Sequence, residues 1–349
     1  MELVKAVDAL WQRGWLPYDV REIVSRELDE SATSLVVDVI ALSCSPHAAA
    51  TVHPRWQSQL DEIGASVWWE GPLLEAWATR HIETLSYAER TASELLKFLG
   101  RLPSLPQILP LPGDVLMSAV RAGLDPKVLN RVRGLLAKAE STAFPEEAEA
   151  LSAKAQELMN RHALERAMLD ADLPALATSR RMWLDKSYFK EKSQLVHVVS
   201  GAFRSRAVAY DGFGFVALVG DEVDLESVEL LSTSLLVQAT RAMVAVGGKA
   251  GKGSEARSRP FRKSFLVAYA SRIGERLEAA AAPEPLAADE RLLPVLADRK
   301  KAVDTLFEEM FTRTRTSRVT VRSAAGWGAG RAAADVADIG TGRNSVTSG

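Results

Sequence analysis

The sequence predicts a mainly α-helical (α+β) protein, and three patterns lead to this fold class. Apolar residues recur at helical spacing over most of the chain. Prolines stand where helices begin or are interrupted. Two short apolar runs, 206–210 and 213–219, are joined by Asp211-Gly212, which is typical of a β-hairpin. We therefore expect an N-terminal helical domain, an αα-hairpin and a small domain of helices around a β-hairpin.

The N-terminal helical domain is expected over residues 1–100. Apolar stripes such as Val20, Ile23, Val24 and Leu28 indicate amphipathic helices. Residues 35–42 fit either a buried helix or a strand, and residues 73–99 fit one long helix or two shorter ones. Prolines crowd residues 103–112 and cannot stand inside a helix, so we expect a stiff linker over 101–124.

Residues 125–170 are expected to form the helical hairpin. Val128, Val132 and Leu136 share one helical face, and a turn at 141–144 leads to Pro145, which suits the first position of a second helix. Residues 180–335 then form the α+β domain. It contains the β-hairpin, a long helix over 225–243, a Gly/Lys-rich loop over 247–254, and further helices over 261–277 and 292–311. Residues 336–349 read as a flexible tail.

The hairpin segment resembles a known family. The matching features are Lys138, the Glu140-Ser141-Thr142 turn, the Phe144-Pro145-Glu146-Glu147 helix start, the Ala155 to Met159 run Ala-Gln-Glu-Leu-Met, and Arg161-His162. The segment is similar to the helical-hairpin domain of unknown function 2786, which occurs in bacterial, often actinobacterial, and phage proteins. More loosely, Val219-Gly220-Asp221 and the run Phe261 to Leu266 resemble the companion domain that follows it. The family has no established activity, so the resemblance implies a layout and no chemistry.

Composition places the chain among ordinary globular proteins. It has 349 residues, 43 basic and 45 acidic side chains, and a formal net charge of −2. The single cysteine, Cys44, fits a reducing compartment. The N-terminus lacks the pattern of a secretory signal, and the most apolar stretch, 35–52, is too short and polar to span a bilayer. We expect a cytoplasmic protein without a membrane partner.

Motifs for catalysis or cofactors are weak, so we expect no cofactor, no catalytic residue and no metal site. The run 247–254 lacks the spacing of a P-loop, and there is no G-x-S-x-G. Cys44, His47 and His53 lie close in sequence, but a structural zinc site needs four ligands. Acidic side chains gather at a helix start, where they complement the helix dipole; as an alternative, three of them could hold a metal for nuclease chemistry. These three are Asp221, Glu222 and Asp224.

Two basic segments stand out more clearly. Residues 241–275 carry eight basic against two acidic side chains, and residues 311–349 carry six against two. In the first segment several cations stand at the start of a helix, which the helix dipole disfavours. On a strand, Arg313 and Arg315 would share one face and Arg318 and Arg322 the other. The expected phosphate contacts are Arg257, Arg259, Arg262, Lys263, Arg313 and Arg315, and Phe261 or Trp327 could stack on bases.

These observations favour a non-enzymatic binding or adaptor protein that contacts nucleic acid. One alternative is a protein-interaction or structural module whose basic residues are plain surface, with an exposed apolar patch within 1–100 or 125–165. A metal-dependent nuclease is the weaker alternative. The small residues over 323–335 permit close helix approach, either within the domain or in self-association. The oligomeric state does not follow from the sequence.

Overall fold

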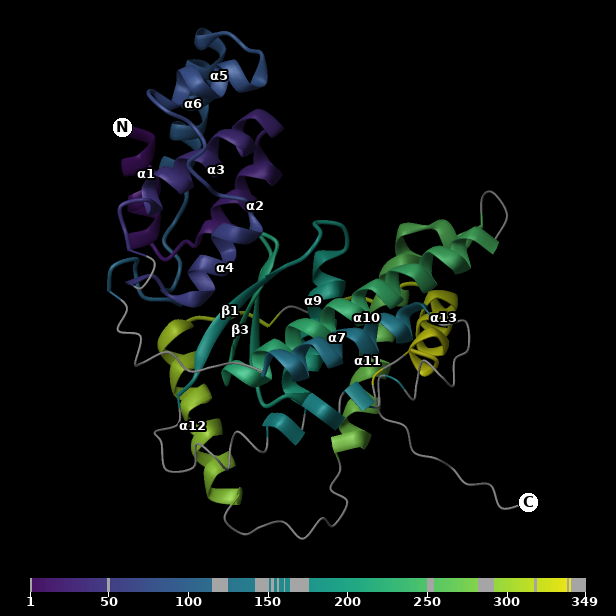
Figure 1. Cartoon of the computed structure of the whole chain (residues 1–349). Coiled ribbons are helices and arrows are strands. Elements are labelled where there is room, and N and C mark those ends of the chain that lie inside the picture. The colour runs from purple at the N-terminus through teal and green to yellow at the C-terminus, as the bar shows by residue number, and fades with distance from the viewer. Residues whose placement is uncertain are drawn as a thin grey trace, which may run out of the picture. The chain divides into compact units, whose positions relative to one another are not determined.

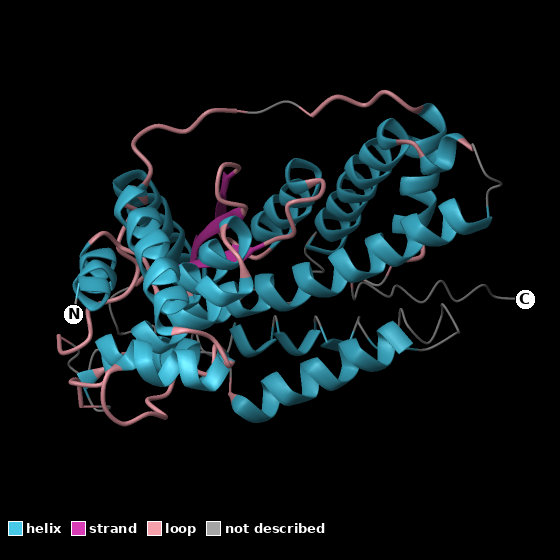
Figure 2. Ribbon diagram, turned by 90° about the horizontal axis from the view of Figure 1, so that it is seen from above, coloured by secondary structure: helices cyan, strands magenta, loops and turns pink. Residues whose placement is uncertain are grey.

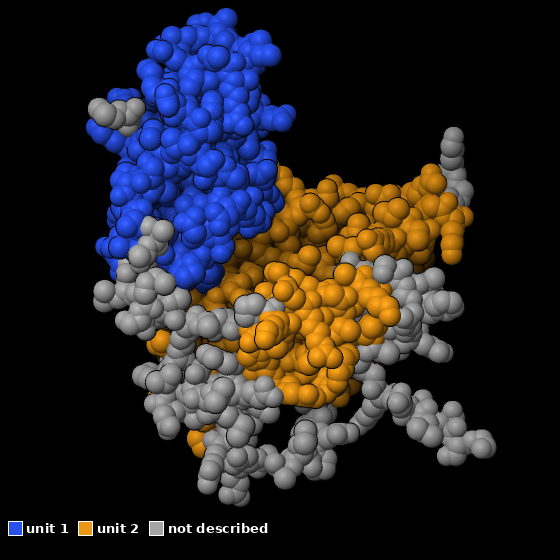
Figure 3. Space-filling view, in the orientation of Figure 1, with its two compact units in different colours: residues 1–121 blue, residues 122–349 orange. Residues whose placement is uncertain are grey.

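The computed structural model describes residues 2–48, 51–114, 125–141, 176–249, 254–281, 292–316, 319–337 and 339, with short runs between 151 and 163. The chain is mainly helical and carries one antiparallel sheet, which confirms the expected fold class (Figures 1 and 2). It divides into two compact units, unit 1 (residues 1–121) and unit 2 (residues 122–349), coloured separately in Figure 3.

Unit 1 is built from helices. They are α1 (Glu2–Gln12), α2 (Pro17–Glu27), α3 (Glu30–Cys44), α4 (Pro54–Glu62), α5 (Leu73–His81) and α6 (Leu85–Arg101). The ambiguous stretch 35–42 is therefore helical, and 73–99 holds two helices. Asp29 begins α3 by accepting a hydrogen bond from the backbone N–H of Ala32.

Tryptophans fill the core of unit 1. Trp15, Trp56 and Trp77 are fully buried. Trp11 packs edge-on against Trp56, with ring centroids 5.2 Å apart, and its indole N–H donates to Ser43 Oγ on α3. These contacts fix α3 against α1 and α4, because a buried indole needs both apolar neighbours and an acceptor.

The described part of the proline-rich segment is extended and packs back on unit 1. Leu102, Leu105 and Leu109 are buried. The backbone N–H of Leu105 donates to the carbonyl of Arg13 at 2.8 Å, and the indole of Trp15 donates to the carbonyl of Pro103. Residues 102–114 are thus part of the packing of unit 1, whereas residues 115–124 lie outside the described part of the chain. The domain boundaries drawn from the sequence stay predictions.

Unit 2 begins with α7 (Pro126–Ser141), and the described residues between 151 and 163 are helical. The remaining elements are β1 (Thr178–Trp183), α9 (Phe189–Ala202), β2 (Arg206–Tyr210), β3 (Phe215–Gly220), α10 (Glu222–Lys249), a 3-10 turn at Glu255–Arg257, α11 (Arg259–Ala281), α12 (Leu292–Met310) and α13 (Ala324–Asp335). The helix α10 continues through Gly247 and Gly248, which the sequence placed in a loop.

The sheet has three strands in the order β1-β3-β2. β2 and β3 form the expected hairpin, in which Tyr210 pairs with Phe215. The sequence missed the third strand, β1, which pairs Arg180 with Leu218 on the far side of β3. β3 is therefore central, and all six of its residues are buried.

Both faces of β3 are covered, because successive side chains point to opposite sides of a strand. Val216 and Leu218 belong to the large core that α9, α10 and α11 share. Val219 packs against Val303 and Phe307 of α12. The sheet thus lies between a helical layer and the single helix α12.

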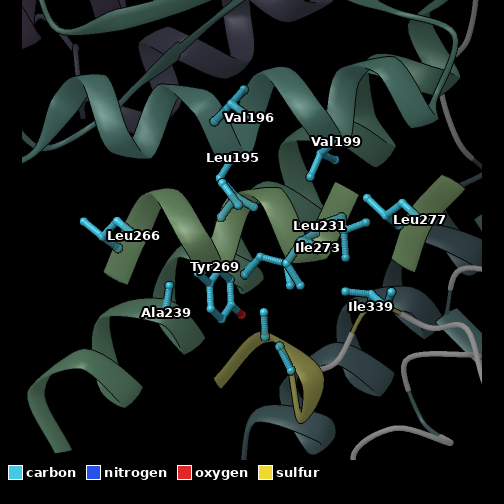
Figure 4. Packing of buried hydrophobic residues seen from close by; sticks show 14 of the residues in the cluster. Leu195, Val196, Val199, Leu231, Ala239, Leu266, Tyr269, Ile273, Leu277 and Ile339 are labelled. Atoms are coloured by element: carbon cyan, nitrogen blue, oxygen red, sulfur yellow. The ribbon is translucent and has the colours of Figure 1, made fainter. Parts of the chain in front are cut away.

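The large core joins nearly every element of unit 2. In Figure 4, Leu195 and Val199 of α9 lie over Tyr269 and Ile273 of α11. On α7 and the second hairpin segment, Val132 and Met159 belong to the same core. The described residues of these two segments therefore pack on the rest of unit 2 through apolar side chains.

The helix α10 is long and apolar enough to cross a membrane by length and composition alone. That is weak evidence, since core helices pass the same test. Leu225, Val228, Leu231 and Leu235 of α10 are buried in the core of unit 2. The structure accounts for the apolar character of α10 by this packing.

Candidate functional site

The first basic segment and the start of α13 lie side by side. Ser264 Oγ, in the second turn of α11, accepts the backbone N–H groups of Arg322 and Ser323, each at 3.0 Å. Ser323 Oγ in turn donates to Glu255 Oε1 at 2.6 Å, just before α11. Arg322 therefore joins the basic residues at the start of α11. We call this group the basic cluster: Arg257, Arg259, Arg262, Lys263 and Arg322.

Two glycines let α11 and α13 approach each other closely. A Cβ at Gly326 would lie 2.5 Å from the carbonyl oxygen of Phe261, and one at Gly330 would lie 2.2 Å from that of Phe265. Gly326 and Gly330 follow one another along α13 in the same order as Phe261 and Phe265 along α11, so the two helices run parallel. Their N-termini consequently lie at the same end of the pair. The small-residue face expected from the sequence packs within its own unit.

This end of unit 2 is electropositive for two reasons. Each helix N-terminus carries a partial positive charge of about half a unit. Neither α11 nor α13 has an acidic residue in its first turn, although acids are favoured there. The caps are neutral serines: Ser258 Oγ accepts from Phe261 N–H, and Ser323 Oγ accepts from Gly326 N–H. Glu255, bonded to Ser323, is a nearby counter-charge.

The members of the basic cluster differ in how their charges are used. Lys263 Nζ pairs at 2.9 Å with Glu191 of α9, a carboxylate that is only 3% exposed. Arg257 donates from Nε to the carbonyl of Gly247, near the C-terminus of α10. By contrast, Arg259, Arg262 and Arg322 have no ion-pair partner among the described residues. These three arginines are available to an anion, whereas Lys263 serves the packing of α9 on α11.

Arg313 and Arg315 lie in the segment between α12 and α13. Residues 313–316 are exposed and irregular, so the shared face that a strand would give these two arginines is not formed. Arg318 lies outside the described residues. Among the described residues, no hydrogen bond or ion pair joins Arg313 or Arg315 to the basic cluster.

Of the two aromatic side chains considered for base stacking, one is buried. Phe261 is 3% exposed and belongs to the large core, where it lies against Phe265. It cannot stack on a ligand. Trp327, in the first turn of α13, is only partly buried.

The acidic side chains before and within α10 are held by arginines from three other segments. Arg180 of β1 bonds Glu222, Glu226 and Glu229, at 2.5, 3.1 and 2.5 Å. Burial of Arg180 opposes its charge, but the coulombic attraction of the glutamates prevails and raises its pKa.

The two aspartates of this region have separate partners. Arg204 makes a bidentate contact with Asp224, and Arg299 pairs with Asp221 at 3.2 Å. Burial raises the pKa of Asp224, and the Arg204 guanidinium opposes this shift. Within the described part of the chain, no group of three or more His, Cys, Asp or Glu could hold a metal ion. The arrangement therefore favours a structural role for the acidic side chains over the nuclease alternative.

The Cys44 region is also explained by packing. Cys44 is buried in unit 1, and burial raises its pKa to about 11. His53 Nδ1 accepts the backbone N–H of Arg55 at the start of α4. Cys44 is thus a buried side chain of unit 1, and His53 is the N-cap of α4.

Sequence reasoning identified four members of the basic cluster but not the fifth. Arg322 was visible as a basic residue, but no local pattern places it beside residues 255–264. The four-residue spacing of Gly326 and Gly330 indicates that another helix packs closely on α13. This spacing is the sequence signal that suggests a neighbouring helix for the segment that follows Arg322.

Comparison with known proteins gives one match. Residues 127–166 match the family described as "Protein of unknown function (DUF2786)". No curated protein and no solved structure matches the chain. The match spans the helical hairpin, of which the structure describes α7 and part of the following segment. Residues 127–166 are therefore similar to the DUF2786 family, and the buried residues Val132, Leu136, Ala155 and Met159 of this segment belong to the large core of unit 2.

Proposed function

We propose that unit 2 is a non-enzymatic binding module that contacts the phosphate backbone of nucleic acid through the basic cluster. One observation carries this proposal: two parallel helix N-termini lie side by side, and the arginines around them include three without an ion-pair partner among the described residues. Those arginines are Arg259, Arg262 and Arg322.

The charge arrangement supports binding because it is unfavourable without an anion. Cations at the N-terminus of a helix lower its stability by roughly 0.3–1 kcal/mol each at low salt. Two other arginines of unit 2, Arg272 and Arg331, are by contrast matched to an acid, since both pair with Glu275. The basic cluster departs from that pattern, and a bound phosphate would remove the repulsion.

The test is fluorescence anisotropy of labelled single-stranded DNA, duplex DNA and RNA, measured over a series of salt concentrations. Each phosphate neutralised contributes about 0.7 to the log–log salt slope for single strands and about 0.9 for a duplex. Replacing Arg259, Arg262 and Arg322 by alanine should therefore weaken binding and lower the slope by about 2 for a single strand.

The matched control removes the same charge from a different helix of unit 2. Lys127, Arg131 and Arg133 lie on α7 and are exposed. Their replacement by alanine should leave the salt slope within experimental error. Equal losses in both triple variants would mean that net charge alone governs binding, and absence of binding at low salt would overturn the proposal.

A protein-interaction role for unit 1 is the second candidate, because unit 1 exposes large apolar side chains. Ile82 is 95% exposed, Val67 48%, Leu85 44% and Trp68 38%. Cross-linking mass spectrometry on cells that produce the wild-type chain or an Ile82→Asp, Leu85→Asp variant would test this role. A partner cross-linked near α5 and α6 should disappear in the variant, and an unchanged set of cross-links would exclude this surface.

A further inference from the structure

Trp327 differs from the other described tryptophans. Trp15, Trp56 and Trp77 are buried in unit 1, and Trp183 of β1 lies 5.1 Å from the ring of Phe215. Trp327 is partly exposed and contacts no other aromatic ring among the described residues, and its indole N–H has no hydrogen-bond partner there. The largest side chain of α13 thus lacks both a ring partner and a hydrogen-bond partner among the described residues.

The neighbours of Trp327 on its own helix are mostly small. Side chains three and four positions away are neighbours on a helix surface, and here these are Ser323, Ala324, Gly330 and Arg331. The first three are too small to cover an indole face. Arg331 is drawn toward α11, where it makes a bidentate pair with Glu275 at 2.7 and 2.8 Å.

The position of Trp327 is fixed relative to the basic cluster. Its neighbour Gly326 packs on the carbonyl of Phe261, and Ser323, the N-cap of α13, donates its backbone N–H to Ser264 Oγ. Arg322 is the next residue toward the N-terminus. A partly exposed aromatic ring therefore lies at the same end of the α11–α13 pair as arginines that have no ion-pair partner among the described residues.

We infer that the basic cluster and Trp327 together form a site for single-stranded nucleic acid, in which arginines neutralise phosphates and the indole stacks on an unpaired base. This inference rests on the proposed function of the basic cluster. Cationic grooves with accessible aromatic rings are typical of single-strand binding, because every base has a face on which a ring can stack. In a duplex the bases are already stacked on one another and present only their edges.

The experiment compares a labelled oligo(dT), an oligo(U) of the same length and a labelled duplex, with wild type, Trp327→Ala and Trp327→Phe. Stacking on a base contributes a factor of roughly 5 to 150 in affinity by alanine substitution. Trp327→Ala should weaken binding of the oligonucleotides at least about fivefold, whereas duplex binding stays unchanged. Trp327→Phe should restore most of the affinity, since phenylalanine also stacks.

The salt dependence separates stacking from phosphate contact. Trp327→Ala removes no charge, so the log–log salt slope should be that of the wild type, unlike the slope of the triple arginine variant. Trp68→Ala, which removes the surface tryptophan of unit 1, is the matched control and should bind like the wild type. Circular dichroism of each variant establishes that it is folded.

The outcomes distinguish this inference from the proposed function. Binding that is lowered by the arginine substitutions but not by Trp327→Ala would overturn the stacking role and leave the phosphate contact standing. Duplex binding as tight as single-strand binding would also overturn it. Failure of the wild type to bind any of the three ligands at low salt would overturn the proposed function, and the single-strand site with it.

Discussion

Replacing Gly330 by alanine tests the close contact that brings the two helix N-termini together. The added methyl group would lie 2.2 Å from the carbonyl oxygen of Phe265 and 2.9 Å from its carbonyl carbon and Cα. These are backbone atoms of α11, so no side-chain rotation can relieve the overlap. Ordinary contact begins at 3.4 Å, which means that the helices must separate by about 1 Å.

The magnitude follows from two opposing effects. Alanine is favoured over glycine inside a helix by about 1 kcal/mol. Overpacking a well-packed contact costs about 1–3 kcal/mol. Gly328 provides the control, because it lies in the same helix, is exposed, and has nothing within 4 Å of a Cβ. The helix-propensity gain is common to both variants, so the difference between them reports the clash alone.

Urea and thermal unfolding followed by far-UV circular dichroism would measure this difference. Gly328→Ala should raise the free energy of unfolding, and Gly330→Ala should lie about 1–3 kcal/mol below it. For a unit of this size that corresponds to roughly 2–12 °C in Tm. If Gly330→Ala is as stable as Gly328→Ala, α11 and α13 do not pack at this distance, and their N-termini are not adjacent.

Three further predictions concern other parts of the chain. Arg180→Met leaves three glutamates of α10 without their counter-charge and should lower the free energy of unfolding by about 3 kcal/mol in urea; unchanged stability would contradict the ion-pair network. Ile82 has a left-handed φ of 58° and is 95% exposed. Ile82→Gly should therefore raise the free energy of unfolding of unit 1 by about 1 kcal/mol, whereas Ile82→Ala should not. Equal free energies of unfolding for the two variants would show that the backbone at residue 82 is not strained. Cys44 should react slowly with a thiol reagent in the native state and rapidly after unfolding, because burial raises its pKa to about 11. Because this pKa is higher in the folded chain, the Cys44 thiol of the unfolded chain loses its proton at lower pH. The free energy of unfolding should therefore fall as pH rises from 9.0 toward 11. A pH profile that is the same in Cys44→Ala as in the wild type would refute this prediction.

The sequence predicts the sheet only in part, and the reason is physical. The hairpin of β2 and β3 has local signals, namely apolar strands and an Asp-Gly turn. β1 reads Thr-Ser-Arg-Arg-Met-Trp, which has no apolar alternation. Arg180 is buried there because α10, which follows much later in the chain, supplies its carboxylates. Because β1 depends on carboxylates from α10, its own residues do not show the alternation of apolar and polar side chains by which a strand is predicted.

The candidate site shows the same division between local and distant information. Residues 257–263 are visibly basic in the sequence, and their position at a helix start follows from periodicity. Arg322 is added by hydrogen bonds to Ser264, which join residues that are 58 and 59 positions apart. Periodicity placed Phe261 on an apolar stripe, and its burial in the core excludes the stacking role that its ring type suggested.

The glycines of α13 also determine how the helix can move. Moving α13 along α11 by one residue, with the rotation of about 100° that this step entails, would set Ala325 and Ala329, or Trp327 and Arg331, against the carbonyls that Gly326 and Gly330 now face. Each of those residues carries a Cβ that the contact has no room for. A one-residue step in either direction is therefore sterically blocked. The pair of helices cannot adjust to a ligand by such a step, whereas the arginine side chains can still change rotamer.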